Sequence, residues 1–279
     1  MIGRVIQTIL MKNPFRSLAW RIGRSLYCWA RGDVLNSPES NGEHWLLKKA
    51  IDAVSARATM LDVGANVGDW TSQAVAYSAQ EAKSVKVISF EPCSATRETL
   101  QKRLSAVACV EICDYALSSR EGQAEFFSAG AGRGTNSLSA VSGAISETVR
   151  LTTMDSLLLA KGIDRVHMVK IDTEGFDLDV MRGAAQSLSA GKIDLIQFEY
   201  NWRWLLNGAS LREVFNFVAD KPYRVGKLVG SKIVFYPHWH FELDKFFENN
   251  YVLVRLGSEF EALGVLARFD SHNVAVASD

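Results

Sequence analysis

Short apolar runs and helical patterns alternate along most of this chain. The apolar runs that predict strands lie at Thr59–Val63, Val85–Phe90, Ala108–Asp114, Val166–Ile171 and Ile193–Glu199. Apolar positions at helical spacing predict helices over 43–57, from about Val67, and over 94–105, 175–188 and 210–219. Alternating strands and helices indicate an α/β fold with a mostly parallel, doubly wound sheet. Such sheets bind ligands beyond the carboxyl ends of their strands, so the loops there matter most.

The rest of the pattern predicts smaller elements and a division of the chain. We expect a short hairpin over 115–127, turning at Arg120–Gly122, and late strands at Tyr223–Leu228, Lys232–Tyr236 and Tyr251–Leu256. We also expect three parts: an arm and connector at 1–42, the main domain at 43–257, and a tail at 258–279.

The overall composition is that of an ordinary soluble protein. Of 279 residues, 48% are hydrophobic and 22% are charged, which is enough apolar material for a substantial core. The formal net charge is zero, which does not favour nucleic acid as a partner. Four cysteines without a CxxC pair fit a reduced, cytoplasmic protein.

The first 31 residues differ from this average. They hold six of the 31 basic residues and no acidic one, so residues 32–279 carry 25 basic against 31 acidic residues, a net charge of −6. The segment also contains Trp20, Tyr27 and Trp29. Two interpretations stay open: a helix packed on the domain with its arginines in water, or a helix that makes peripheral contact with an anionic membrane. No apolar window approaches the length of a spanning helix.

Three successive strand ends carry residues suited to a nucleoside. The loop LDVGANVGDW at 61–70 has glycines that allow a tight turn and close backbone approach. ISFEP places an acid at the end of the second strand, where a carboxylate can accept both ribose hydroxyls. DYALS follows the third strand, and its Asp could accept from an adenine amino group. The candidate cofactor residues are Asp62, Gly64, Asn66, Gly68, Glu91, Pro92, Asp114, Tyr115 and Ala116.

A dinucleotide site would use similar logic, but the sequence disfavours it. The fingerprint G-x-G-x-x-G is not met, because Asn66 takes the place of the second glycine and no glycine falls three residues later. A pyrophosphate requires an open helix N-terminus. Asp62 instead offers a negative group, which suits the amino or sulfonium part of S-adenosylmethionine better. A nicotinamide-dependent dehydrogenase is therefore the weaker hypothesis.

The stretch MVKIDTEGFDLDVMRG at 168–183 places two acids where the fourth strand ends. Asp172 shares a strand face with Met168 and Lys170 and is our candidate general base. Glu174 could contact the substrate, or it could simply interact with the dipole of the next helix. Two such acids could also bind Mg²⁺, although their spacing does not demand a metal.

Two further segments are candidates for the acceptor side. IQFEYN places Glu199 and Asn201 at the end of the fifth strand. There Glu199 could bind the acceptor, share a divalent ion with Asp172, or simply end the strand at the surface. The Gly- and Ser-rich loop at 128–143 is either a lid over the acceptor, with Asn136 and Ser137 facing the site, or disordered.

Several of these motifs together resemble the FkbM-type methyltransferase family. They are DVGANVGDW, FEPCSATRETL, DYALSSREGQAEF, TNSL at 135–138, LTTMDSLL, VKIDTEGFDLDVMRGA and IQFEYN. The resemblance runs from about Glu43 to about Tyr236. It implies a Rossmann-like sheet of seven strands with a reversed last strand, bound S-adenosylmethionine, and O-methylation of a hydroxyl on a sugar, glycan or secondary metabolite. An N-methyltransferase of this fold and a noncatalytic docking module are the alternatives.

Overall fold

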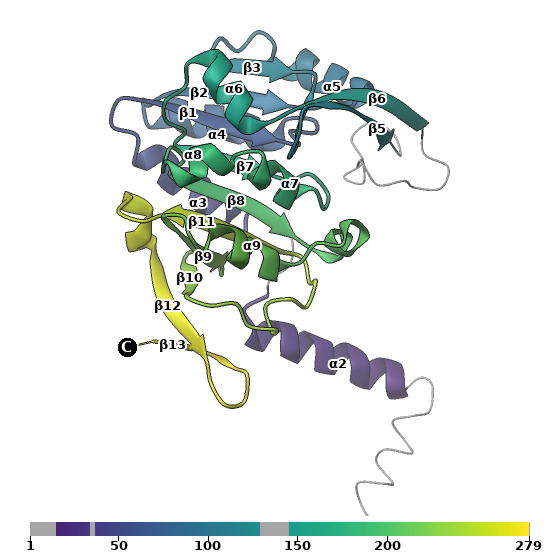
Figure 1. The fold of residues 1–279 in the computed structure, drawn as a ribbon. Helices are drawn as coiled ribbons and strands as arrows, with labels where there is room; N and C mark the ends of the chain where they lie inside the picture. Colours follow the sequence, from purple (N-terminus) through teal and green to yellow (C-terminus); the bar gives the residue numbers. More distant parts are fainter. Residues whose placement is uncertain (1–14, 34–36, 129–144, 279) are drawn as a thin grey trace, which may run out of the picture.

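The computed structural model describes residues 15–33, 37–128 and 145–278 (Figure 1). Its centre is a parallel five-stranded sheet in the order β3-β2-β1-β7-β8. These strands are β1 (Arg57–Val63), β2 (Ser84–Phe90), β3 (Val110–Cys113), β7 (Met168–Ile171) and β8 (Leu195–Tyr200). Each falls on a predicted apolar run, so the alternating pattern is confirmed.

The last residues of the central strands lie side by side. Val63 at the end of β1 pairs with Phe90 of β2 on one side and with Ile171 of β7 on the other. Phe90 in turn pairs with Cys113 of β3. The residues that follow these strands therefore begin at one edge of the sheet, as the ligand-binding rule for parallel sheets requires.

A reversed strand completes the predicted order. β11 (Asn249–Arg255) lies antiparallel between β8 and β9 (Tyr223–Leu228). The resulting seven-stranded order, with the last of the seven strands reversed, is the one that the resemblance to the FkbM-type family implies. Three more strands extend the sheet to ten: β10 (Ile233–Tyr236), β12 (Gly264–Phe269) and β13 (Ala275–Ala277). Residues after 257 thus pair with the main sheet.

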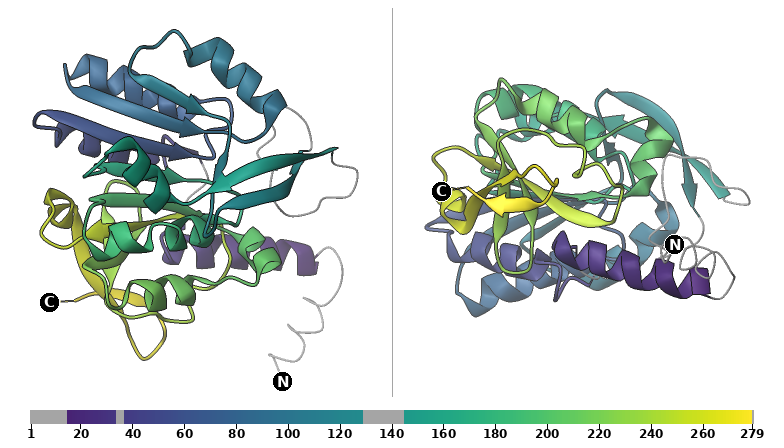
Figure 2. Two further views of the ribbon diagram at one scale, coloured as in Figure 1. Left: turned by 45° about the horizontal axis from the view of Figure 1, so that its top comes forward. Right: turned by 90° about the horizontal axis from the view of Figure 1, so that it is seen from below.

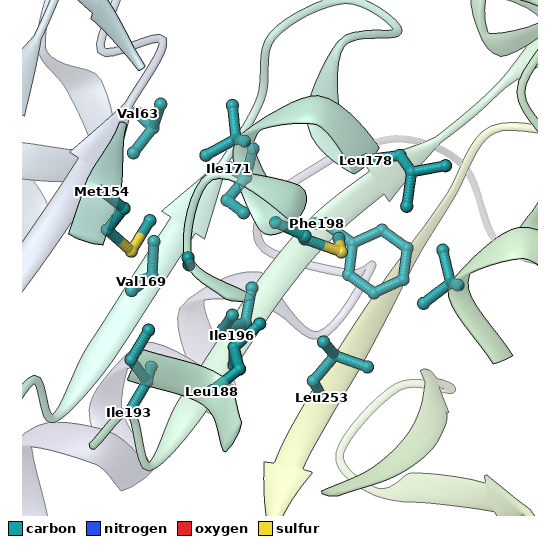
Figure 3. Close-up of a cluster of buried hydrophobic side chains, with 14 of the residues drawn as sticks. Val63, Met154, Val169, Ile171, Leu178, Leu188, Ile193, Ile196, Phe198 and Leu253 are labelled. Carbon is teal, nitrogen blue, oxygen red and sulfur yellow. The ribbon is translucent and has the colours of Figure 1, made fainter. Parts of the chain in front are cut away.

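Helices cover both faces of the sheet. On one face lie α3 (Glu43–Asp52), α4 (Asp69–Gln80) and α5 (Ser94–Leu104); on the other lie α6 (Met154–Lys161), α7 (Asp177–Arg182), α8 (Ala185–Ser189) and α9 (Leu211–Val218). Figure 3 shows Val169 and Ile171 of β7 packed among apolar side chains of the second layer. Met168 of the same strand packs with the first layer. Burial on both faces explains the continuous apolar runs.

The predicted hairpin at 115–127 is wrong in its pairing. β4 (Ala116–Leu117) and β5 (Gly122–Ser128) do not pair with each other; both pair with β6 (Ile145–Thr152), β4 in parallel and β5 antiparallel. The pattern did not predict β6, because this strand has polar residues between its few buried apolar ones, such as Val149 and Leu151.

The helix expected over 175–188 is likewise two helices. α7 ends at Arg182 and α8 begins at Ala185. The carboxylate of Asp155 accepts hydrogen bonds from the backbone N–H groups of Gln186 and Ser187, at 2.9 Å each. A side chain from outside the helix thus supplies acceptors for the first amide groups of α8, which stabilises a new helix start.

The long N-terminal helix α2 (Phe15–Ala30) projects from the body (Figure 2). Two short 3₁₀ helices, η1 (Trp202–Asn207) and η2 (Glu259–Leu263), complete the set. Among the residues that the structure describes, no helix combines the length and the apolar character needed to cross a bilayer.

Candidate functional site

A cleft opens where β1, β2 and β7 end, beneath the small β4-β6-β5 sheet. It encloses about 730 Å³ of empty space, including its open mouth. Its lining residues are Val63, Gly64, Asn66, Phe90, Glu91, Pro92, Ala116, Leu117, Phe126, Asp172, Thr173, Glu174 and Phe176. Seven of these were predicted from the sequence: Gly64, Asn66, Glu91, Pro92, Ala116, Asp172 and Glu174.

The loop after β1 lies against the chain after β7. Gly64 has a φ of +84°, and a Cβ atom there would lie 1.9 Å from the carbonyl oxygen of Asp172. Only glycine permits both this backbone conformation and this approach. Two residues on, Asn66 also has a positive φ, of 49°. Its buried side-chain Oδ1 has no hydrogen-bond partner among the described residues. The loop therefore holds a buried acceptor without a partner, next to the cleft that Asn66 lines.

Glu91 is held with its carboxylate at the edge of the cleft. Its two oxygens accept hydrogen bonds from the backbone N–H groups of Asn66 and Cys93, at 2.9 Å each. Burial raises its pKa to about 7, although these two bonds oppose the shift. A carboxylate has about four lone-pair directions, so acceptor capacity remains for ligand hydroxyls.

Asp62 lies beneath the loop rather than in the cleft. Its side chain is 2% exposed and accepts a hydrogen bond of 2.5 Å from the hydroxyl of Thr71. That hydroxyl also lies 2.7 Å from the hydroxyl of Ser89. Burial raises the pKa of Asp62 to about 6. Asp62 thus supports the loop from below, and it is not among the residues that line the cleft.

Three other predicted cofactor residues also do not line the cleft. The Asp114 side chain is largely exposed, with its carboxylate 3.9 Å from Arg150. Tyr115 turns its ring against Phe90 and under the guanidinium of Arg150. Gly68 lies beneath Leu100 of α5. Of the DYALS segment at 114–118, only Ala116 and Leu117 line the cleft.

Asp172 lines the cleft and pairs with a buried lysine. The ammonium of Lys170 lies 3.0 Å from Oδ2 of Asp172 and 3.2 Å from Oε2 of Glu43 in α3. Lys170 is 4% exposed, whereas the Asp172 side chain is 36% exposed. Although burial alone disfavours the ammonium, the neighbouring carboxylates hold the pKa of Lys170 well above its usual value. Asp172 therefore faces the cleft with a fixed positive charge behind it.

Glu174 has a strained backbone. Its φ is +56°, an uncommon value for a residue with a side chain, and its carboxylate lies 2.9 Å from the guanidinium of Arg203 in η1. Burial, and then the negative charge of Asp172, raise the pKa of Glu174 to about 8. Such strain concentrates at functional sites, and it places a second carboxylate in the cleft beside Asp172.

Glu199 and Asn201 lie behind the cleft rather than in it. Oε1 of Glu199 accepts a hydrogen bond of 2.8 Å from Asn201, and the backbone N–H of Glu199 donates to Asp177 at 3.3 Å. Burial, and then Asp172, raise the pKa of Glu199 to about 9. The same two causes raise the pKa of Asp177, which accepts from the hydroxyl of Thr173, to about 7.

The sequence reasoning missed several residues of this site. Phe126 of β5, Thr173 and Phe176 line the cleft, and Lys170 and Arg203 hold its two acids. A signal existed for Lys170, because a lysine inside an apolar strand must have partners when it is buried. No comparable signal marked Phe126, since the pairing of its strand was not predicted.

Two predicted substrate-binding residues and the metal site considered from the sequence remain. Asn136 and Ser137 lie outside the described residues. Within the described ranges, no group of three or more His, Cys, Asp or Glu side chains is arranged to hold a metal ion. The divalent cation considered from the sequence therefore gains no support.

Comparison with known proteins agrees with this geometry. The family model of the methyltransferase FkbM domain matches residues 62–225, more than half of the chain. The chain belongs to the FkbM methyltransferase family. The match starts at Asp62, at the end of β1, and ends at Val225 in β9, so it includes every described residue of the cleft.

Solved structures similar to this FkbM-family chain are distant in sequence. A methyltransferase FkbM from Methylobacillus flagellatus KT is 15% identical, with a TM-score of 0.45, over 73% of this chain and 45% of that one. This chain thus spans less than half of that protein's length. An S-adenosylmethionine-dependent methyltransferase from Agrobacterium tumefaciens is 11% identical (TM-score 0.40; 78% and 62% covered). An rRNA methylase from Streptococcus thermophilus is 10% identical (TM-score 0.40; 80% and 99% covered). None of the curated protein sequences matches the chain significantly.

Proposed function

We propose that this protein is an S-adenosylmethionine-dependent O-methyltransferase whose acceptor is a hydroxyl of a sugar, glycan or secondary metabolite. One observation carries the proposal. The nucleoside-type residues Gly64, Asn66 and Glu91 share a single cleft with the two acids Asp172 and Glu174. Cofactor and acceptor could therefore meet in one space, which methyl transfer requires.

The residues at the β1 and β2 ends fit the cofactor. The remaining lone pairs of Glu91 suit the two ribose hydroxyls. Asn66 also lines the cleft, and a side-chain amide suits an amino group or hydroxyl of the same ligand. The apolar side chains of Phe90, Leu117 and Phe126 give an adenine ring a surface to pack against.

The electrostatics of the cleft also suit a cation. Burial raises the pKa of the acids in and behind the cleft, which are Asp62, Glu91, Glu174, Asp177 and Glu199. Lys170 and Arg203 are the cations paired with acids there. A positively charged ligand would lower the cost of ionising these carboxylates, whereas a pyrophosphate would raise it. This supports a sulfonium and disfavours a nicotinamide dinucleotide.

Asp172 is the group we assign to the proton. S-adenosylmethionine would supply a methyl group on a positively charged sulfur, and the electron pair of the broken C–S bond would stay on that sulfur. Asp172 would take the proton of the acceptor hydroxyl while the new C–O bond forms. Such general-base assistance contributes about 10²–10⁴-fold. Holding the acceptor in line is a separate contribution, which we assign to the cleft walls.

Calorimetry tests the cofactor part of the proposal. Titration of the full chain with S-adenosylmethionine, and separately with S-adenosylhomocysteine, should give one binding event each. Glu91→Gln should weaken both by roughly 10- to 100-fold, because hydrogen bonds to a charged acceptor each contribute about 1.5–3 kcal/mol. Glu98→Gln, on the exposed face of α5, is the matched control and should bind like the wild type. Absence of binding heat from both ligands to the wild type would refute the proposal.

Turnover tests the reaction. Formation of S-adenosylhomocysteine should be stimulated by hydroxyl acceptors in a panel that also contains amines. Stimulation by amines alone would instead favour N-methylation. Cofactor binding without turnover on any acceptor, equally in the wild type and in Asp172→Asn, would favour a noncatalytic docking module.

A further inference from the structure

The helix α2 attaches to the body by one face only. The guanidinium of Arg24 lies 5.0 Å from the ring centroid of Phe247, and the ring of Tyr27 packs edge-on against the same Phe247. Arg31, just after the helix, pairs with Glu242 at 2.9 Å, and the Tyr27 hydroxyl also donates to Glu242. The side of α2 that carries Arg24 and Tyr27, with Arg31 next to it, is therefore its docking face.

The opposite face of α2 is an apolar stripe. Residues 15, 18, 22, 26 and 29 follow one another at intervals of three and four, which places them on one side of a helix. They are all exposed to solvent: Phe15 53%, Leu18 56%, Ile22 52%, Leu26 59% and Trp29 80%. Nothing in the described part of the chain buries this stripe, and α2 has no buried residue at all.

An apolar stripe of this size needs an explanation, because soluble proteins rarely expose so many large apolar side chains together. The helix could have docked by this stripe, which would have been the ordinary outcome for an amphipathic helix. It docks instead by its arginine and tyrosine side. The described part of the chain thus leaves the stripe available to a partner.

The charges around the stripe identify the partner. At 100° per residue, Arg16 and Arg21 lie on either side of the stripe, and both are exposed. Residues 1–31 contain no acidic residue, whereas residues 32–279 carry a net charge of −6. An anionic surface would attract residues 1–31 and repel residues 32–279. Self-association through the stripe would instead bring the flanking arginines of two copies together, which is unfavourable.

We propose that α2 docks the protein on an anionic membrane surface, with its apolar stripe in the headgroup region and Arg16 and Arg21 on lipid phosphates. This arrangement matches interfacial helices, which lie in the membrane plane with aromatic and aliphatic side chains below and basic ones at the phosphate level. A helix of 16 residues extends about 24 Å, and Arg16 and Arg21 on its flanks keep it at the interface. The proposal does not depend on the reaction in the cleft.

Vesicle co-sedimentation of the full chain tests this. We expect it to pellet with vesicles of equal parts phosphatidylcholine and phosphatidylglycerol, and much less with pure phosphatidylcholine. High salt should release it, because screening shortens the range of the attraction. Failure of the wild type to pellet with anionic vesicles, or equal pelleting with both compositions, would overturn the proposal.

Replacing the apolar stripe should remove binding. The triple variant Leu18→Gln, Ile22→Gln and Leu26→Gln keeps good helix formers and leaves the docking face intact. Its affinity for anionic vesicles should fall by roughly tenfold or more, because each side chain loses apolar area that the membrane would bury. Unchanged pelleting would overturn the proposal.

A matched control separates the stripe from exposed apolar surface in general. Leu159 is 84% exposed, and Val265 and Val274 are each 49% exposed, all outside α2. The variant Leu159→Gln, Val265→Thr and Val274→Thr should bind anionic vesicles like the wild type. If it loses as much affinity as the α2 variant, the stripe has no special role and the proposal is overturned.

A second pair of variants tests the role of the flanking arginines in membrane binding. Arg16→Gln with Arg21→Gln should weaken binding to anionic vesicles by on the order of tenfold or more, and should flatten the salt dependence. Arg57→Gln with Arg120→Gln, two exposed arginines elsewhere, should change neither the affinity for vesicles nor its salt dependence.

Sedimentation velocity without vesicles tests whether the stripe instead binds a second copy of the chain. A wild-type dimer that the stripe variant converts to a monomer, with no vesicle binding, would assign the stripe to self-association and overturn the proposal.

Discussion

The ammonium of Lys170 lies 3.0 Å from the carboxylate of Asp172, and this pair joins the core of the sheet to the cleft. Lys170 is buried in β7, while Asp172 is the first residue after that strand and is partly open to the cleft. The lysine also lies 3.2 Å from Glu43 of α3, so one cation neutralises a carboxylate from a distant part of the chain as well. The burial of Glu43 and the position of Asp172 at the cleft both depend on this lysine.

Removal of the Lys170 charge should destabilise the fold. In Lys170→Met the buried Glu43 would lose the cation that it pairs with among the described residues, and breaking a buried ion pair typically costs about 3–5 kcal/mol. We expect a loss near the lower end, because Asp172 can still reach water. Denaturant unfolding monitored by circular dichroism measures the free energy of unfolding. The double variant Glu43→Gln/Lys170→Met should recover part of the loss, and no recovery would contradict the assignment of the cost to Glu43.

Loss of the Asp172 charge should reduce turnover more than cofactor binding. If Asp172 takes the acceptor proton, Asp172→Asn should lower kcat by about 10²–10⁴-fold, while the Kd for S-adenosylhomocysteine changes little. Glu174→Gln should retain much more activity. The pH dependence of kcat separates the two acids, since a base must be ionised to act. A rise in rate centred near pH 8, the pKa of Glu174, that disappears in Glu174→Gln would assign the proton to Glu174 instead.

The ends of the central strands could be predicted from the sequence, but the side-chain directions around them could not. Gly64, Glu91 and Asp172 each follow an apolar run, and parallel pairing brings such ends together. Whether a residue then turns into the cleft depends on its neighbours. Asp62 turns toward the hydroxyl of Thr71, and Asp114 turns outward near Arg150. Those contacts depend on helix and strand packing that local patterns do not encode.

The pairing of the small β4-β6-β5 sheet over the cleft could not be predicted from the sequence, for a related reason. β5 pairs with β6, whose first residue lies 17 positions after the last residue of β5, and only tertiary pairing links the two. The turn at Arg120–Gly122 suggested a local hairpin, and local signals favour neighbours in sequence. The place of Phe126 in the cleft therefore could not be predicted from the sequence.

Substitution of Gly64 should lower the free energy of unfolding by more than its backbone conformation alone explains. In Gly64→Ala the new Cβ would lie 1.9 Å from the Asp172 carbonyl oxygen, so either the β1 loop or the β7 loop must move. Gly162→Ala is the matched control, since its φ is also positive, at +60°, but nothing lies within 4 Å of a Cβ there. The control should lose about 1–2 kcal/mol of unfolding free energy. Gly64→Ala should lose more than that and also bind cofactor weakly; equal losses would contradict the close approach.

Glu199 should make the protein less stable as the pH rises. Its pKa in the folded protein is raised to about 9, against an ordinary value of 4.5, because it is buried and lies near the negative charge of Asp172. The folded state therefore holds this proton more tightly than the unfolded chain does. The resulting stability is complete below pH 4.5 and is lost progressively as the pH rises through about 9.

The variant Glu199→Gln isolates this contribution. Glutamine keeps a carbonyl oxygen to accept the hydrogen bond from Asn201, but it carries no charge at any pH. We expect Glu199→Gln to exceed the wild type by at least about 1 kcal/mol near pH 9, the equivalent of roughly one pKa unit, and to lose this advantage below pH 4.5. Unfolding free energies measured across that range provide the check, with Glu125→Gln on the exposed side of β5 as the control. Parallel pH curves for Glu199→Gln and the wild type would mean that Glu199 does not take up a proton in the folded state. The negative charge behind the cleft would then be larger than we infer.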